Sequence, residues 1–328
     1  MPECKLCQKV EATQTGSHIT SSFFVKSQIG TRGDEVAFIL TTDPNQDYTQ
    51  NVGAEPILED NILCIGCERR ISVLEDIISR EYTNKVFKLQ YSENFTLQQS
   101  DNWEQLVLGK VDPIITMLFI YSMIFRMHST STGLYKDFVI SEELNEKLRF
   151  QLDGLMPEFS QEEFTIIEKQ KEWMKAVSVS HDIFEPIKMT IFRPSDNVDN
   201  SANMDCYDTR NVSPYQFLLN DHLFIFADIE EQFSVTTESD FYQLNLGDLE
   251  PYKFSPSTPY LNIIPDDEWI RINKELVDKV MTVRATIASN QCKIELRGSL
   301  SRSPQPEEIH ECIRKKMIQF LESIKPKE

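Results

Sequence analysis

Two pairs of cysteines have the spacing of metal ligands, namely Cys4 with Cys7 and Cys64 with Cys67. Two residues separate the thiols in each pair, so both can reach one ion. Together the pairs supply the four thiolates of a closed tetrahedral Zn²⁺ shell. One pair alone would also fit a redox motif, but two pairs, the second followed by a helical pattern, favour zinc. Because such a shell has no open position for water, we expect a structural zinc site.

The other three cysteines, Cys206, Cys292 and Cys312, have no partner at ligand spacing. We expect them to be ordinary buried or half-buried thiols. Seven cysteines, four of them in C-x-x-C pairs, do not match a secreted disulfide framework. The opening "MPECKLCQKVEAT" has no apolar segment of the kind found in a secretory signal. These features favour a cytoplasmic protein.

The residues between and beside the cysteine pairs carry a resemblance. Ser17-His18-Ile19 lies between the pairs, and Asn61 opens the stretch "NILCIGC". With these motifs, residues 1–90 resemble the four-cysteine HNH nuclease family, which has a ββα-metal, treble-clef fold. They are most similar to a group of uncharacterised bacterial HNH-like proteins with a Ser-His-Ile stretch. The segment "IYSMIFRMHST", which contains Ser122 and Arg126, resembles the Ser-x-x-x-Arg helix that follows in that group.

The resemblance implies a catalytic set. His18 would be the general base that activates water against a phosphodiester, Asn61 would orient His18, and Glu68 would bind Mg²⁺ or Mn²⁺. The set is incomplete, because Ser17 stands where the family usually has a carboxylate and Glu68 stands where His or Asn is common. In the alternative interpretation, His18 is a structural histidine that braces the zinc site. Whether the chain is an enzyme therefore stays open.

The net charge of the chain indicates which classes of partner to expect. The chain has 33 Lys and Arg against 52 Asp and Glu, a net charge of -19. This balance disfavours broad nucleic-acid binding, although nucleic acid stays open as a partner, and we expect a protein partner. The longest apolar run, residues 113–125, is shorter than the roughly 20 residues that cross a bilayer, so no membrane partner is expected. The sequence leaves the oligomeric state open.

The elements that would position these residues follow from apolar spacing. Ile71, Leu74 and Ile78 recur at helical intervals, so a helix should begin at Cys67 or just after it. Further helices are expected over residues 103–110, from Pro113 onward, and over 141–155, 160–177, 266–290 and 306–324. Runs rich in β-branched and aromatic residues predict strands over 187–195, 222–229 and 231–237.

The resulting fold class is α+β, with an N-terminal treble-clef zinc module, a helical middle, and a C-terminal small antiparallel sheet with closing helices. The expected boundaries are 1–90 for the HNH-like zinc-binding module, 91–180 for the helical region and 181–328 for the α+β C-terminal region. Two functions fit. One is a metal-dependent endonuclease in a bacterial or phage defence-type system, a context implied by the resemblance alone. The other is a non-catalytic, zinc-stabilised interaction or adaptor protein with an acidic docking surface.

Overall fold

The structure is a computed structural model of the chain. It describes residues 2–21, 38–40, 49–51, 58–83, 95–99, 104–109, 112–131, 135–158, 160, 162–163, 165–178, 185–195, 206–207, 211–219, 221–233, 253–255, 259–299 and 302–323. The chain divides into two compact units, one made of residues 1–28 and 54–270, the other of residues 29–53 and 271–328. The three-part division expected from the sequence stays a prediction.

The largest sheet, in the first unit, is mixed and has seven strands. Its order is β5 (Phe95–Gln99), β6 (Glu104–Leu108), β11 (Tyr260–Ile264), β7 (Ile187–Pro194), β10 (His222–Asp228), β9 (Tyr215–Leu219) and β8 (Cys206–Tyr207). Neighbouring strands are antiparallel, except that β11 runs parallel to β7. Every residue of β9 and β10 is buried. The centre of the sheet is therefore covered on both faces, as its nearly continuous apolar runs require.

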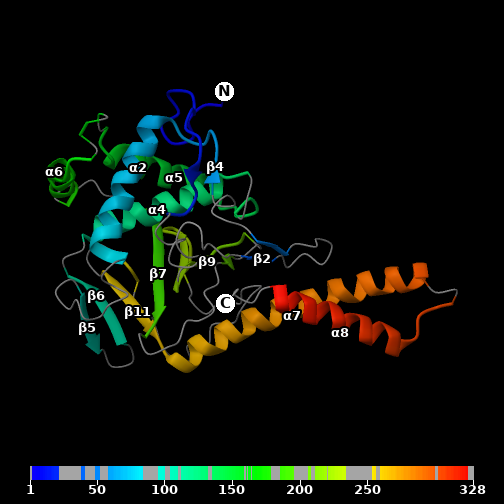
Figure 1. The fold of residues 1–328 in the computed structure, drawn as a ribbon. Helices are drawn as coiled ribbons and strands as arrows, with labels where there is room; N and C mark the ends of the chain where they lie inside the picture. The colour runs from blue at the N-terminus through cyan, green and yellow to red at the C-terminus, as the bar shows by residue number, and fades with distance from the viewer. Residues whose placement is uncertain are drawn as a thin grey trace. The chain divides into compact units, whose positions relative to one another are not determined.

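Helix α4 (Pro113–Ser129) lies between this sheet and the other helices of the first unit (Figure 1). Asp112 caps its first turn, accepting hydrogen bonds from the N–H groups of Ile114 and Ile115 at 2.9 and 3.1 Å. Every residue of the helix except Pro113 and His128 is buried. Such all-round burial explains why the segment is apolar on every face rather than amphipathic.

Helices α2 (Ile65–Ile78) and α5 (Glu142–Leu155) pack against α4, as does α6 (Ile167–Ser178). A short π-helical turn (Ser79–Thr83) continues α2. Strands β1 (Ser17–His18) and β4 (Leu58–Glu59) form a small antiparallel sheet beside the cysteine pairs. The N-terminal segment thus rests on a layer of helices, which in turn covers the large sheet.

The second unit contains most of α7 (Asp266–Ser299) and all of α8 (Pro306–Ser323). It also holds an antiparallel hairpin of β2 (Phe38–Leu40) and β3 (Thr49–Asn51). Cys292 on α7 and Cys312 on α8 form a disulfide, with Cα atoms 5.9 Å apart. The expectation that these two cysteines are separate thiols is wrong, because the two helices bring side chains 20 positions apart in sequence into contact.

The α+β class is confirmed, and so are helices after the second cysteine pair, from Pro113, and over residues 142–155, 266–299 and 306–323. The predicted helix over residues 103–110 is wrong, since residues 104–108 form strand β6. The C-terminal sheet is also larger than expected, because it takes strands from residue 95 onward. Residues 234–237 of the predicted strand 231–237 lie outside the described residues, and residues 231–233 are not in a strand.

Within the part of the chain that the structure describes, no helix combines the length and the apolar character needed to cross a membrane.

Candidate metal centre

The four paired cysteines converge on one point, as their spacing predicts. The sulfur atoms of Cys4, Cys7, Cys64 and Cys67 all lie within 4.8 Å of one another, and those of Cys7 and Cys64 are 3.9 Å apart. Four sulfurs placed about 2.3 Å from a central zinc ion would be about 3.8 Å from each other. The cluster therefore has the dimensions and the donor chemistry of a tetrahedral site that could hold a metal ion such as zinc.

Interactions among the thiols also favour a bound cation. A side-chain hydrogen bond from Cys67 is the main cause that lowers the pKa of Cys4, and backbone N–H groups lower it further. The same bond raises the pKa of Cys67, to which burial and the charge of Cys4 also contribute. Burial is the main cause that raises the pKa of Cys64. Each thiolate opposes the ionisation of its neighbours, and a divalent cation at the centre would remove that opposition.

Backbone geometry shapes both cysteine pairs. In the first pair, the N–H of Cys4 donates to the carbonyl of Val10 at 2.8 Å, and Gln8 turns the chain with a positive φ of 52°. In the second, Cys64 is the N-cap of α2, and its sulfur accepts the N–H of Cys67 at 3.4 Å. The N–H of Lys5 donates to the carbonyl of Ile62 at 3.0 Å and joins the two pairs.

Two buried arginines fasten the cysteine pairs to helix α5. Arg70, on α2, donates to the carbonyls of Leu152 and Met156 at 3.3 and 2.7 Å, at the C-terminal end of α5, where unpaired carbonyls need donors. Its other terminal nitrogen lies 2.7 Å from a carboxylate oxygen of Asp153 and 3.9 Å from the sulfur of Cys67. Arg149, on α5, donates to the carbonyl of Leu6 at 3.1 Å.

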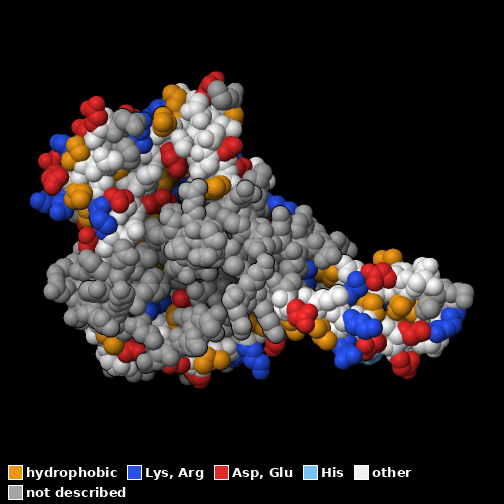
Figure 2. Space-filling view, in the orientation of Figure 1, with side chains coloured by type: hydrophobic (Ala, Val, Ile, Leu, Met, Phe, Trp, Pro, Cys, Tyr) orange, Lys and Arg blue, Asp and Glu red, His pale blue; other side chains and the backbone are white. Residues whose placement is uncertain are grey.

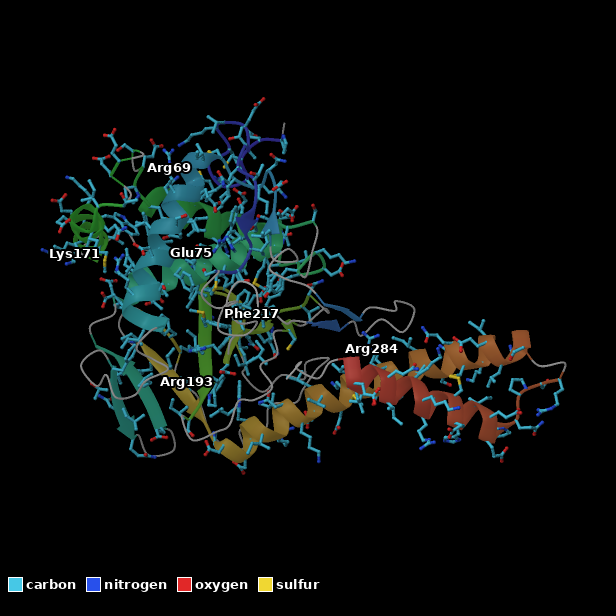
Figure 3. All side chains as sticks on the ribbon, viewed as in Figure 1. Arg69, Glu75, Lys171, Arg193, Phe217 and Arg284 are labelled. Carbon is cyan, nitrogen blue, oxygen red and sulfur yellow. A yellow bond between two sulfur atoms is a disulfide. The ribbon has the colours of Figure 1, made fainter. Side chains whose placement is uncertain are left out.

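A third buried arginine, Arg126 on α4, fastens strand β1. Its guanidinium donates to the backbone carbonyl of His18 at 2.5 Å and to a carboxylate oxygen of Glu75 on α2 at 2.8 Å. Its Nε donates to the carbonyl of Ser122 at 3.2 Å, so both residues of the Ser-x-x-x-Arg segment take part. Figure 3 shows Glu75 where α2 passes close to α4. The guanidinium thus links β1, α2 and α4.

The structure brings Ser17 and Glu68 together. The hydroxyl of Ser17, which is fully buried, donates to Glu68 Oε2 at 2.9 Å. Burial raises the pKa of Glu68, Glu75 raises it further, and Arg126 and Ser17 act in the opposite direction. His18 follows Ser17 on β1, where it pairs in register with Leu58. The two positions that the resemblance assigns to a catalytic cation therefore meet beside the residue that it assigns as the base.

Asn61 has a backbone role. It lies three residues before Cys64 with a φ of 61°, a left-handed conformation that Asn tolerates better than most residues. Its N–H donates to the carbonyl of Gln14 at 2.8 Å, and the N–H of Gln14 donates back to the carbonyl of Leu63 at 3.1 Å. Asn61 thus turns the chain into the second cysteine pair. Its role as orienter of His18 stays a prediction.

Sequence reasoning missed the part played by the three buried arginines. Arg126 lies in the Ser-x-x-x-Arg segment, so the resemblance marked its position without giving it a function. Arg70 and Arg149 interrupt otherwise apolar faces of α2 and α5, where a buried charge requires partners. That mismatch between charge and helical face is the signal that could have found them.

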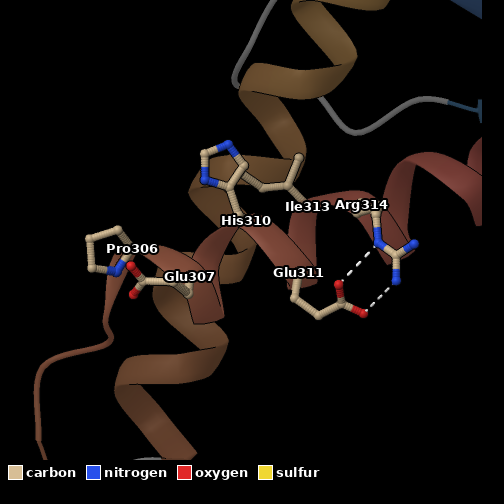
Figure 4. A pocket seen from close by; sticks show the side chains of 6 residues that line it. All are labelled: Pro306, Glu307, His310, Glu311, Ile313 and Arg314. Atoms are coloured by element: carbon tan, nitrogen blue, oxygen red, sulfur yellow. Dashed lines mark hydrogen bonds and ion pairs between the residues drawn. The ribbon is translucent and has the colours of Figure 1, made fainter.

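A hollow of about 580 Å³ lies along the first turns of α8. Figure 4 shows its lining, which includes exposed His310 and the ion pair of Glu311 with Arg314 at 2.9 Å. All six lining residues come from one helix, and acidic and basic groups both occur among them. On the face seen in Figure 2, basic and acidic side chains are likewise interspersed along the described parts of α7 and α8. This pattern is typical of a solvated surface rather than of a phosphate-binding stripe.

Comparisons with protein-family models, with curated proteins and with solved structures gave no match to this chain.

Proposed function

We propose that this chain is a non-catalytic interaction protein in which the cysteine cluster binds structural Zn²⁺. The hydrogen bond from the buried hydroxyl of Ser17 to the half-buried carboxylate of Glu68 carries this proposal. A cation that assists phosphodiester cleavage needs charged oxygen ligands and open positions for water. Position 17 supplies a fully buried hydroxyl instead, and that hydroxyl donates to Glu68 Oε2 at 2.9 Å. A neutral donor in place of a charged oxygen ligand opposes the binding of a hydrated hard cation there.

The buried arginines support a structural role for the zinc. Each of the three buried arginines donates to a backbone carbonyl of a different segment: Arg70 to Met156, Arg126 to His18 and Arg149 to Leu6. The cysteine pairs and the helical layer therefore hold each other in place. Structural zinc can supply about 10–16 kcal/mol of apparent binding free energy. In this proposal that energy organises the layer of α2, α4 and α5 rather than a separate, nucleic-acid-reading finger. The treble-clef assignment of the module belongs to the same proposal.

The partner is a protein with a basic surface. A net charge of -19 attracts cationic groups and repels phosphate, so association with a nucleic acid would work against the field of the chain.

Metal-dependent phosphodiester cleavage is the second candidate, and the convergence of Ser17 and Glu68 beside His18 favours it. In that case His18 is the general base, Asn61 orients it, and Glu68 holds Mg²⁺ or Mn²⁺ with the help of water ligands. The defence-type context would then follow from the resemblance to HNH-like proteins.

A nicking assay separates the two functions. Purified, zinc-loaded protein is incubated with plasmid DNA, single-stranded DNA and RNA in the presence of Mg²⁺, Mn²⁺ or Ni²⁺, beside His18→Ala and Glu68→Gln. Lys171→Ala, a change at an exposed position on α6, is the matched control. We expect no metal-stimulated cleavage by any of these proteins. Cleavage by the unaltered protein and by Lys171→Ala that is lost in His18→Ala would overturn the proposal and establish the nuclease.

A further inference from the structure

A depression of about 500 Å³ opens beside the cysteine cluster, at the N-terminal end of α2. The first cysteine pair and the turn after it form one wall, and the first turns of α2 form the other. The described residues that line it are Cys7, Lys9, Val10, Glu11, Thr13, Cys64, Ile65, Gly66, Cys67, Arg70 and Glu158. We call this depression the cysteine groove. The zinc site would fix both walls, so the groove would be preformed.

Two aliphatic side chains give the cysteine groove an apolar patch. Val10 and Ile65, one from each wall, are each 53% exposed. Ile65 is the first residue of α2, a position at which a polar or acidic residue is more usual, because its side chain faces solvent and lies near the positive end of the helix dipole. Exposed aliphatic side chains from both walls of one hollow are typical of a surface that receives an apolar side chain from a partner.

Two exposed acidic groups, Glu11 and Glu158, lie on the groove. Of the two cations in its lining, Arg70 is buried and pairs with Asp153 at 2.7 Å, whereas Lys9 is 68% exposed and lies 3.7 Å from the other oxygen of the same carboxylate. Asp153 thus offsets part of their positive charge. A zinc ion held by four thiolates adds a net negative charge on the floor of the groove. This environment repels phosphate and attracts ammonium or guanidinium groups.

We propose that the cysteine groove binds a short basic segment of a protein partner, with an aliphatic side chain of that segment between Val10 and Ile65 and flanking Lys or Arg side chains at Glu11 and Glu158. This inference rests on the proposed function, because it names the docking site of the same interaction protein. Burial of the aliphatic side chain supplies most of the affinity. The exposed acidic groups select the sign of the partner's charge and contribute less.

Fluorescence anisotropy with labelled peptides tests the site on the full, zinc-loaded chain. The probe is the octapeptide Ser-Lys-Leu-Lys-Ile-Lys-Ser-Gly. One comparison peptide has Glu in place of each Lys, and another has Ser in place of Leu and Ile. The groove variants are Ile65→Ser and Glu158→Lys. Because any basic peptide is drawn to so acidic a protein, two matched controls outside the groove are needed, namely Ile294→Ser, at a 72% exposed isoleucine, and Asp278→Lys, at an exposed acid on α7.

We expect Ile65→Ser to weaken binding of the basic aliphatic peptide by about tenfold and Glu158→Lys to weaken it by a smaller factor, while both controls bind it as the unaltered protein does. Both comparison peptides should bind more weakly to the unaltered protein. Equal losses in groove variants and controls, no binding at all, or equal binding of the acidic peptide would overturn the proposal. Any of these results without cleavage in the nicking assay leaves the non-catalytic function standing, whereas cleavage removes that function whatever the peptides do.

Discussion

The buried guanidinium of Arg126 on α4 forms an ion pair at 2.8 Å with half-buried Glu75 on α2, and the same guanidinium binds the backbone carbonyl of His18. The side chain of Arg126 is 1% exposed and that of Glu75 is 20% exposed. A single buried cation thus holds strand β1 against the two helices. The helical layer therefore holds the backbone of His18, in the Ser-His-Ile stretch, in place.

Replacing Arg126 with Gln should destabilise the first unit strongly. The change leaves Glu75 without its cation, and removal of one partner of a fully buried ion pair typically costs about 3–5 kcal/mol of unfolding free energy. Because Glu75 is 20% exposed, we expect a loss below that range. Urea denaturation followed by circular dichroism measures the loss. Arg314→Gln, which removes an exposed pair with Glu311 on α8, should leave the urea midpoint unchanged. Equal midpoints for the two variants would contradict the assigned role of Arg126.

His128 should make stability depend on pH. Its Nδ1 accepts the N–H of Ile140 at 3.2 Å, and its Nε2 lies 3.6 Å from a carboxylate oxygen of Glu142. Burial lowers the pKa of His128, nearby Lys5 lowers it further, and Glu142 acts in the opposite direction. A proton on Nδ1 would also break the bond from Ile140. Just below about pH 6.5 the unfolded chain therefore binds more protons than the folded chain. The free energy of unfolding decreases as the pH falls from there through the pKa of His128 in the folded chain.

The variant His128→Asn tests this pH dependence, because its amide oxygen can accept the N–H of Ile140 but does not titrate in this range. Urea unfolding of both proteins is measured at several pH values from about 5 to about 7.5. Protonation of the cysteine ligands affects both proteins alike, so the difference between them isolates His128. We expect the difference in unfolding free energy to shift in favour of the variant as the pH falls. Parallel curves would show that His128 does not titrate with a lowered pKa.

The disulfide between Cys292 and Cys312 should stabilise the α7–α8 helices independently of the metal. The bond closes a loop with a sequence separation of 20, and loops of about that length contribute roughly 3 kcal/mol. In Cys292→Ser, hydrogen exchange measured by mass spectrometry should become faster in peptides from residues 271–323. Bound zinc should not change, because the four ligands belong to the other unit. Unchanged exchange in this region, or loss of zinc, would contradict the assignment; Cys206→Ser is the control.

Local patterns in the sequence predicted the four-cysteine cluster and most helices. The C-x-x-C spacing is a short-range signal, and Asp112 followed by Pro113 marked the start of α4 through capping chemistry. The sequence of strand β6, "EQLVL", is too short for its apolar period to distinguish a strand from a helix, so the predicted helix there is wrong. Strands β9 and β11 were not predicted for the same reason, since each has only five residues.

Long-range contacts account for what the sequence did not predict. The carbonyl of His18 and the guanidinium of Arg126 are 108 positions apart, and no local pattern shows that they meet. The disulfide depends on how α7 and α8 lie against each other, and the sequence of either helix alone does not contain that information. The meeting of Ser17 and Glu68 was implied by the resemblance, but the burial of Ser17 was not, and that burial is what weighs against catalysis.

Metal analysis of the purified full chain tests the central claim most directly. Zinc is measured by inductively coupled plasma mass spectrometry beside Cys64→Ser, and thiols are counted with a chromogenic disulfide reagent before and after addition of a chelator. We predict one tightly bound zinc ion for each unaltered chain, with the thiols of Cys4, Cys7, Cys64 and Cys67 protected until the chelator removes it, and a Cys64→Ser protein that loses zinc and melts at a lower temperature. A metal-free, well-folded protein with freely reactive thiols, or a variant with full zinc content and an unchanged melting temperature, would contradict the account.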